Sequence, residues 1–497
     1  MGSYITFPEL LLWLPLLAAV FSFFLNGQNA AKTVAIVASL LILVVSVASL
    51  FYTDNAKYIT YNQVNYYWLK HIGNSFYIGL DGTGRLLTFL TALSFPLIFI
   101  STHKNNYENP GAFYGLMLLT QAGLMGVFVA MDALLFYFFW ELALIPVYFL
   151  CSKWGGEKRI QATFKFFVYT FAGSLLMLVG IIYVYLHTPQ RLFTDGSVAS
   201  HSFALHAFKA AILNHSEQVW LFWLFFLAFA VKMPVFPFHT WQPDTYDQSP
   251  TSVTMVLSGI MVKMGLFGVI RWLIPLFPFA IESFSPVVII LSITGMLYAS
   301  FIAMKQDNLK KLIAYSSIAH IGLMSAALFA LNEMSVQGVM IQMFSHGINI
   351  IGMWIVVDML ERQTGVKNIS ELGGVAHKAP ALTIFLVIIA LANIALPLTN
   401  AFVGEFLMFS GLFQLNVWYA AAAGISIILA AVYTLRMIQK VFYGESVPLT
   451  EKISDISFGE RVSLLVIVLF IFLFGIMPQP IIEFTKEAVS MLIAFKN

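Results

Sequence analysis

Apolar residues run through this chain in long stretches that short polar loops separate. A helix that crosses a membrane needs about 20 mostly apolar residues. Fourteen stretches are close to or above that length: residues 8–25, 33–52, 83–101, 111–131, 132–151, 161–187, 217–238, 250–273, 285–304, 308–331, 335–361, 380–412, 417–443 and 460–478. The pattern therefore predicts an all-α polytopic membrane protein with about 14 transmembrane helices.

Composition favours one membrane domain over several soluble ones. Hydrophobic residues make up 60% of the 497 residues and charged residues only 10%, against about 25% charged residues in an average soluble chain. No hydrophilic stretch is long enough for a soluble domain, so residues 1–497 are predicted to form a single unit. The formal net charge of +2 favours neither a nucleic acid nor an acidic partner.

The sequence contains no recognisable cofactor motif. Cys151 is the only cysteine, so this chain alone forms no internal disulfide and holds no cysteine-ligated iron–sulfur cluster. Gly82-Thr83-Gly84 lacks the third glycine and the strand of a dinucleotide-binding motif, and neither a P-loop nor a His-Glu-x-x-His pair is present. We therefore expect no cofactor and no metal on this chain.

Positive residues in the loops predict the orientation. Loops after the odd-numbered predicted helices hold about twice as many lysines and arginines as the loops on the other side, and positive loops are retained in the cytoplasm. Both termini are therefore predicted to lie outside, on the periplasmic face of a bacterial cytoplasmic (inner) membrane.

Two predicted helices contain interruptions. The seventh carries Pro234 and Pro237, and each proline removes a backbone donor and clashes with the preceding turn. The twelfth, residues 380–412, would be about 50 Å long if straight, against a hydrocarbon core of about 30 Å. Pro397, followed by Thr399 and Asn400, marks the expected break.

Interrupted helices at matching positions in two halves of a chain indicate inverted repeats of the kind found in transporters. Helices seven and twelve lie five apart, and a unit of five helices inverts its topology when it is repeated. We therefore predict helices 1–3 at residues 1–105, a first five-helix repeat at 111–273, a second inverted repeat at 285–443, and helix 14 with a C-terminal tail at 460–497.

Four charged residues lie deep inside apolar stretches: Glu141, Lys232, Lys263 and Glu405. On insertion scales, a charged side chain at the centre of a bilayer costs about 2.5–3.5 kcal/mol, and such residues usually mark a pathway for ions or protons. This pattern predicts a chain that moves charge across a membrane.

Each of these four residues also has a structural interpretation. Glu141 could be a neutral carboxylic acid that is hydrogen-bonded within the bundle, and Lys232 could be its static partner. Burial disfavours the charged form of Lys232 whereas a nearby carboxylate favours it, and this competition is typical of a switchable proton carrier. Lys263 could be tethered to a neighbouring carbonyl group. Glu405 could cap a helix end, because its depth depends on where the twelfth helix breaks.

Three histidines and one further lysine extend the set of candidates. His320 and His346 lie within the tenth and eleventh predicted helices, and histidine suits proton transfer, although a core histidine held by hydrogen bonds is the alternative. His239 follows the second proline of the seventh helix and either contributes to an entry path or faces water. Lys165 is a weaker candidate for the same path, because it lies near a helix end and can extend toward the surface.

Five stretches of the sequence resemble the antiporter-like subunits of respiratory complex I: FYFFWELALIPVYFL (136–150), FLAFAVKMPVFPFHTWQPDTYDQSPTSVTMVLSGIMVKMGLFGVIRW (226–272), KKLIAYSSIAHIGLM (310–324), MFSHGINIIG (343–352) and FVGEF (402–406). The resemblance covers nearly the whole predicted membrane core. It implies 14 helices built on inverted five-helix repeats. The residues that match the family's proton relay are Glu141, Lys232, Lys263, His320, His346 and Glu405.

Two features resemble the M-type members of this family more than the others. L-type and N-type members have lysine at the position of Glu405, and L-type chains continue into a long lateral helix, whereas this chain ends at Asn497 soon after the last predicted helix. The resemblance implies a non-redox subunit that translocates protons while NADH:quinone oxidoreduction takes place elsewhere in a complex. The implied partners are L-type and N-type subunits, membrane lipid, protons and internal water, and no nucleic acid.

Other functions also fit a row of buried charges. A subunit of a multisubunit cation/proton antiporter would consume a proton gradient instead of building one, and relatives in membrane-bound hydrogenases use a different electron donor. A passive spacer between two active subunits would need none of the buried charges. Gene neighbours and copurifying subunits would separate these alternatives.

Overall fold

Long apolar helices make up most of the computed structural model, which describes residues 5–52, 62–69, 72–190 and 201–494. In the first half of the chain the helices are α1 (Phe7–Phe23), α2 (Gln28–Phe51), α3 (Gly82–Ser101), α4 (Pro110–Val129), α5 (Ala133–Trp154), α6 (Arg159–Leu186), the short α7 (Leu205–Lys209), α8 (His215–Lys232), α9 (Trp241–Gln248), α10 (Thr251–Val256) and α11 (Lys263–Gly268). The π-helical segment Leu257–Met261 lies between α10 and α11, and a second one, Val269–Leu273, extends α11, so that Thr251–Leu273 forms one continuous helical span.

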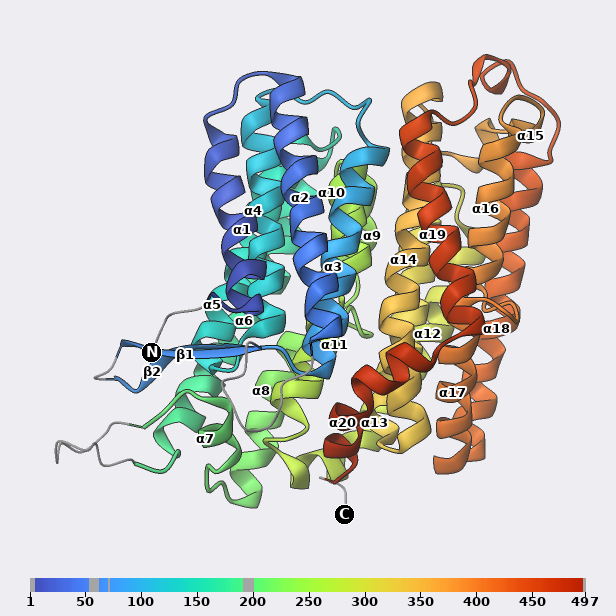
Figure 1. The fold of residues 1–497 in the computed structure, drawn as a ribbon. Helices are drawn as coiled ribbons and strands as arrows, with labels where there is room; N and C mark the ends of the chain where they lie inside the picture. Colours follow the sequence, from blue (N-terminus) through green and yellow to red (C-terminus); the bar gives the residue numbers. More distant parts are fainter. Residues whose placement is uncertain (1–4, 53–61, 70–71, 191–200, 495–497) are drawn as a thin grey trace.

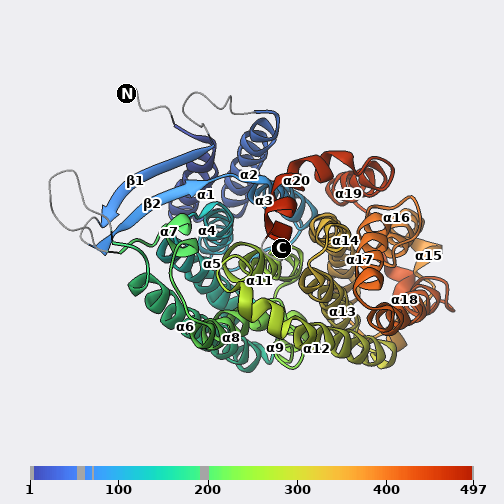
Figure 2. The ribbon, with the colours of Figure 1, turned by 90° about the horizontal axis from the view of Figure 1, so that it is seen from below.

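The second half of the chain is also helical. Its helices are α12 (Pro278–Lys305), α13 (Leu309–Ala330), α14 (Glu333–Thr364), the short α15 (Val375–Lys378), α16 (Pro380–Asn393), α17 (Asn400–Leu415), α18 (Val417–Met437), α19 (Phe458–Ile476) and α20 (Gln479–Ala494). A π-helical segment, Ile438–Phe442, extends α18, and short 3-10 turns lie at Ile369–Glu371 and Thr450–Lys452. Seen along the bundle, the helices of the first half lie on one side and those of the second half on the other (Figure 2).

Eleven helices of the described residues are long and apolar enough to cross a membrane. The other three predicted spans correspond to α1, which has 17 residues, and to the two interrupted helices α8–α9 and α16–α17. The chain is a multi-pass membrane protein, and the count of 14 spans stays a prediction. Of the basic residues used to predict the orientation, Lys57, Lys70, Arg191 and Lys496 lie outside the described residues.

Side chains at the helix starts explain several of the boundaries. The carboxylate of Asp81 accepts a hydrogen bond from the backbone of Gly84 at the start of α3, and Asp132 accepts two at the start of α5. Asn214 and Asn332 cap α8 and α14 in the same way. Such caps satisfy backbone donors that have no partner inside the helix, so these polar residues at the ends of apolar stretches help to fix where α3, α5, α8 and α14 begin.

The two predicted interruptions are confirmed. Helix α8 ends at Lys232 and α9 begins at Trp241, with Pro234 and Pro237 between them. Helix α16 ends at Asn393 and α17 begins at Asn400, and Ala395 and Leu398 in this break have positive φ angles of 57° and 73°. Both breaks leave backbone groups inside the bundle that only protein or water can satisfy.

A β-hairpin departs from the all-helical prediction. Strands β1 (Gln63–Leu69) and β2 (Asn74–Gly79) pair in an antiparallel sheet that projects sideways from the helices (Figure 1). The hairpin lies between the second and third apolar stretches, where the sequence pattern predicts only a connecting loop, although the consecutive aromatic residues Tyr66, Tyr67 and Trp68 favour strands. Helix α20 likewise replaces the predicted C-terminal tail and packs against α3 and α14.

The most buried spans lie at the centre of the molecule. The apolar windows of α14 and of the span from α10 to residue 273 are 100% buried, and that of α13 is 94% buried. Helices α14 and α17 approach closely at Gly338 and Gly404, because a Cβ atom added at Gly338 would lie 2.8 Å from the carbonyl oxygen of Gly404. These central helices carry Lys263, His320 and His346, and the close approach brings Glu405 next to α14.

Polar contacts join the end of α9 to the loops before α13 and after α14. The carboxylate of Asp247 accepts hydrogen bonds from Nζ of Lys367 at 2.6 Å and from Nδ2 of Asn308 at 2.8 Å. Burial raises the pKa of Asp247, but these hydrogen bonds and the Lys367 charge outweigh burial, so that the pKa lies below that of an ordinary aspartate. The folded state therefore favours the carboxylate form.

Replacing Asp247 by asparagine is expected to destabilise the folded chain at pH 7 by about 2 kcal/mol, the typical contribution of hydrogen bonds to a charged group. A carboxyl group whose pKa is lowered by folding contributes stability above its unfolded pKa and loses it as the pH falls through the folded pKa. The difference between wild type and Asp247→Asn should therefore shrink below about pH 4. Thermal unfolding in detergent at pH 7, 5 and 3.5 measures it. Asp244→Asn is the control, since that side chain is 44% exposed and its pairs should contribute little.

Candidate functional site: a row of buried ionisable side chains

Lys263 lies at the centre of the site and is completely buried. Its Nζ lies 2.7 Å from Nδ1 of His346 on α14 and 3.0 Å from the carbonyl oxygen of Ser258. The π-helical segment Leu257–Met261 precedes it, and the extra residue per turn of a π-helix rotates the following side chains relative to an ordinary α-helix. Lys263 is thus both tethered to a carbonyl group, as its structural interpretation expected, and in direct contact with a titratable side chain.

The row of ionisable side chains extends from His346 through His320 to the carboxylate of Glu405. The rings of His346 and His320, on α14 and α13, have centroids 5.6 Å apart. Nδ1 of His320 lies 3.2 Å from Oε1 of Glu405 on α17, and Nε2 of Gln342 lies 3.4 Å from the same oxygen. Glu405 is therefore not a helix cap. The structure brings together four of the predicted residues in the order Lys263, His346, His320, Glu405.

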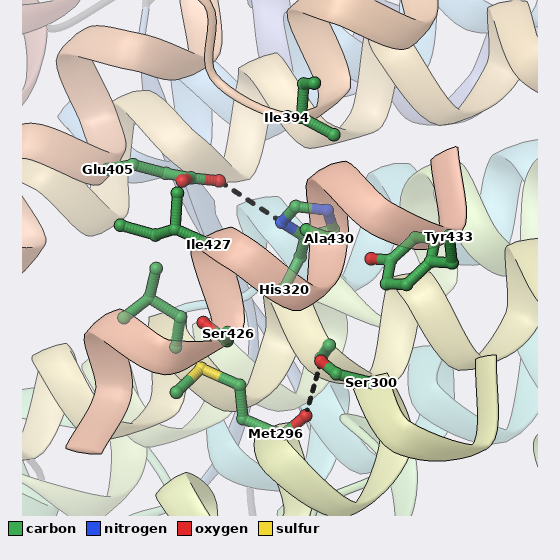
Figure 3. Close-up of a pocket in the computed structure, with 11 residues that line it drawn as sticks. Met296, Ser300, His320, Ile394, Glu405, Ser426, Ile427, Ala430 and Tyr433 are labelled. Carbon is green, nitrogen blue, oxygen red and sulfur yellow. Dashed lines mark hydrogen bonds and ion pairs between the residues drawn. The ribbon is translucent and has the colours of Figure 1, made fainter. Parts of the chain in front are cut away.

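A small cavity lies beside the His320–Glu405 contact (Figure 3). Its volume is about 20 Å³, and its polar lining includes Ser300, Ser426 and Tyr433 as well as the two ionisable side chains. About 10–15 Å³ is needed to hold one water molecule. The cavity therefore has room for about one water within reach of the carboxylate and the imidazole.

Lys232 is buried inside the bundle, and among the described residues no ion pair joins it to Glu141. Nζ of Lys232 is buried without a hydrogen-bond partner and lies 5.8 Å and 5.6 Å from the ring centroids of Trp140 and Phe166. Oε1 of Glu141 is also buried without a partner, whereas the residue as a whole is only half-buried on α5. Two buried polar atoms that lack partners are the places where water molecules are expected. A water molecule could therefore bridge the predicted pair.

The two candidate entry residues differ from each other. Lys165 is 35% exposed and donates to the carboxylate of Asp244 at 2.9 Å and to the carbonyl oxygen of Thr240 at 2.8 Å, so it is a surface ion pair. His239 is only 4% exposed, and its Nδ1 has no hydrogen-bond partner. The interpretation of His239 as a residue that faces water is therefore wrong, because it is enclosed by rings such as those of Phe236 and Tyr298.

The sequence analysis missed several polar side chains that surround the row. Asn393, Ser316 and Tyr433 form hydrogen bonds next to His320, and Gln342 contacts Glu405. Each is a polar residue within an apolar stretch, which was the available signal. Among the described residues, no group of three His, Cys, Asp or Glu side chains is arranged to hold a metal ion.

Comparisons with known proteins agree with the fold. Residues 130–430 match the family described as NADH:quinone oxidoreductase/Mrp antiporter, TM. The NADH-quinone oxidoreductase subunit M of Rickettsia typhi is 36% identical and aligns with 97% of this chain and 98% of its own length. The F(420)H(2) dehydrogenase subunit M of Methanosarcina mazei is 32% identical over 98% of both chains.

A solved structure shares the same architecture. One chain of respiratory complex I from Thermus thermophilus superimposes with a TM-score of 0.90 at 26% identity, covering 99% of this chain and 100% of that chain. These relatives and this solved structure match nearly the whole length of the chain. The chain therefore belongs to the NADH:quinone oxidoreductase/Mrp antiporter family and is a homologue of its M subunits.

Proposed function

We propose that this chain is a proton-translocating subunit in the membrane arm of a respiratory NADH:quinone oxidoreductase. Protons would pass along the buried side chains while NADH oxidation and quinone reduction take place on other subunits. The observation that carries the proposal is the row from Lys263 through His346 and His320 to Glu405, with contacts of 2.7 Å and 3.2 Å at its two ends. The relationship to M subunits along 97% of the chain supports it.

In the proposed mechanism, the charge of Glu141 controls whether Lys232 keeps its proton. When Glu141 is ionised, Lys232 retains its proton, and withdrawal of that carboxylate by a neighbouring subunit's charge releases the proton toward Lys263. A tenfold change in the proton-binding constant of such a group corresponds to about 1.4 kcal/mol. The half-buried position of Glu141 leaves it within reach of a neighbour. Water would bridge the gap, as the unpaired atoms of Glu141 and Lys232 require.

The proposed assembly places L-type and N-type subunits beside this chain in a bacterial cytoplasmic membrane, with both termini outside and lipid around the exposed apolar helices. No cofactor would be carried here. We also propose two inverted five-helix repeats. The breaks after α8 and α16 support them. The span that follows each interrupted helix also contains a π-helical segment, Leu257–Met261 in the first half and Ile438–Phe442 at the end of α18 in the second.

The decisive experiment uses the assembled complex carrying Lys232→Ala. In membrane vesicles, NADH-driven acidification is expected to fall by roughly 10²-fold, the usual contribution of a positioned proton-transfer group. Lys311→Ala is the matched control, because Lys311 is a half-buried lysine whose contact with Asp244 spans 3.6 Å. Normal pumping by an assembled Lys232→Ala complex would leave the passive spacer as the better description.

The identity of the electron donor distinguishes the proposed complex from the complexes that contain related subunits. A homologue in F(420)H(2) dehydrogenase is 32% identical, and the family also contains Mrp antiporter subunits. Copurified subunits identified by mass spectrometry should include an NADH-oxidising module. A hydrogenase module, or antiporter subunits alone, would reassign the complex while leaving the proton relay in place.

A further inference from the structure

Both ring nitrogens of His320 are held by the same interrupted helix. Nδ1 lies 3.2 Å from Oε1 of Glu405, in the half after the break, and Nε2 lies 3.4 Å from Nδ2 of Asn393, the last residue of the half before the break. Asn393 is 5% exposed and His320 7% exposed. Glu405 belongs to the proposed relay, whereas Asn393 has no role in it so far.

The neighbours of Asn393 determine which way its amide points. Nδ2 also lies 3.4 Å from Oγ of Ser316, and the hydroxyl of Tyr433 donates to the same Oγ at 3.0 Å. While Ser316 accepts from both neighbours, the amide nitrogen of Asn393 faces it, and the second hydrogen of that nitrogen is free for His320. The amide then acts as a donor toward the imidazole.

A hydrogen-bond donor that faces Nε2 of His320 selects one tautomer of the neutral imidazole ring. Neutral imidazole has one nitrogen that donates and one that accepts, so an Nε2 that accepts from Asn393 leaves the proton on Nδ1. That proton points at Oε1 of Glu405. The hydrogen bond made by one ring nitrogen commonly sets the role of the other.

We infer that Asn393 is a positioning residue that holds Nε2 of His320 as a hydrogen-bond acceptor from one side of the break, so that the ring proton stays on Nδ1 toward Glu405. The inference rests on the proposed proton relay. A proton that arrives from His346 must be accepted at Nε2, and this requires the Asn393 amide to turn so that its oxygen faces the ring. Ser316 can follow this rotation by donating its own hydroxyl to that oxygen. A movement of the break therefore changes which protonation state of His320 is favoured.

Two substitutions at one position test the inference, because they act in opposite directions. Asn393→Asp supplies only acceptors when ionised and favours a doubly protonated ring, whereas Asn393→Leu removes the contact and leaves both nitrogens open. The titratable groups around the ring are Glu405 on α17, His346 on α14, Lys263 on α11 and Tyr433 on α18, and all remain in both variants.

The measurement is NADH-driven acidification in vesicles that contain the assembled complex, recorded from pH 5.5 to 8.5. Asn393→Asp should move the pH profile toward alkaline pH. Asn393→Leu should lower the number of protons translocated per NADH about five-fold, the factor that the loss of one net hydrogen bond represents, without shifting the pH profile. The control is Asn349→Leu, which removes another buried amide, one that pairs with Asn400, and should leave the pH profile unchanged.

Identical pH profiles for Asn393→Asp, Asn393→Leu and the control would overturn the inference. If Asn393→Leu does not assemble, the comparison between Asn393→Asp and wild type still decides, since aspartate has nearly the same volume as asparagine. Failure here is distinguishable from failure of the proposed function. Loss of pumping in Lys232→Ala with wild-type behaviour of both Asn393 variants would remove only the role of Asn393.

Discussion

Replacing Lys263 by methionine is expected to lower NADH-driven proton translocation by about 10²-fold, because the substitution removes the ionisable group that contacts Nδ1 of His346. Methionine is of similar length and suits a completely buried site, so the fold should be retained. Acidification of vesicles with NADH as donor measures the effect. Reduction of an artificial electron acceptor that bypasses the membrane arm verifies that the complex is assembled.

Lys263→Arg separates a relay from a static charge. The guanidinium of arginine keeps the positive charge but does not lose its proton in proteins. If Lys263 serves only as a tether to the carbonyl oxygen of Ser258, arginine should restore pumping where methionine does not. If Lys263 passes protons, both variants should be defective. Lys165→Met is the control, since this half-exposed lysine pairs with Asp244 at the surface and should be dispensable.

Backbone chemistry allowed the large features of the fold to be predicted. Prolines inside apolar stretches have one consequence, the loss of helical hydrogen bonds, so the breaks near Pro234 and Pro397 could be placed from the sequence. The β-hairpin was missed because its strands are short and its aromatic residues Tyr66, Tyr67 and Trp68 are consecutive, so that apolar and polar positions do not alternate clearly. The π-helical segment before Lys263 could not be foreseen either, because periodicity arguments assume 3.6 residues per turn.

The candidate site was predictable as a set of residues and not as an arrangement. A buried charge is conspicuous in an apolar stretch whatever its neighbours are, which is why Lys263 and Glu405 stood out. The contact between Lys263 and His346 joins two residues that are 83 positions apart in the sequence, and no local sequence pattern predicts such a contact. Neutral polar residues such as Asn393 carry too little cost of burial to attract notice, yet they orient the ionisable groups.

A second group of buried charges has a different role. Arg362, near the end of α14, contacts Asp358 at 3.5 Å, Oδ1 of Asn105 at 3.2 Å, and the carboxylate of Glu460 on α19. The side chains of Asp358 and Glu460 are 9% and 3% exposed. This cluster links α14 to α19 and to the loop before α4, and in the part of the chain that the structure describes its ion pairs and hydrogen bonds do not include a residue of the proposed relay.

Replacing Arg362 by methionine is expected to destabilise the folded chain by about 3–5 kcal/mol, because removing one partner leaves buried carboxylates without a compensating charge. That loss is a large part of the total stability of a typical protein, so the amount of subunit recovered from membranes should fall steeply. The combined variant Arg362→Met, Asp358→Asn, Glu460→Gln removes all three charges together and should recover most of the stability, since neutral replacement of a whole buried ionic cluster is often tolerated. Thermal unfolding in detergent compares the three proteins. Equal destabilisation by the single and combined variants would mean that Arg362 acts through packing of its aliphatic stem. As a control, pumping per assembled complex should be unchanged in both variants, because neither changes a residue of the row from Lys263 to Glu405.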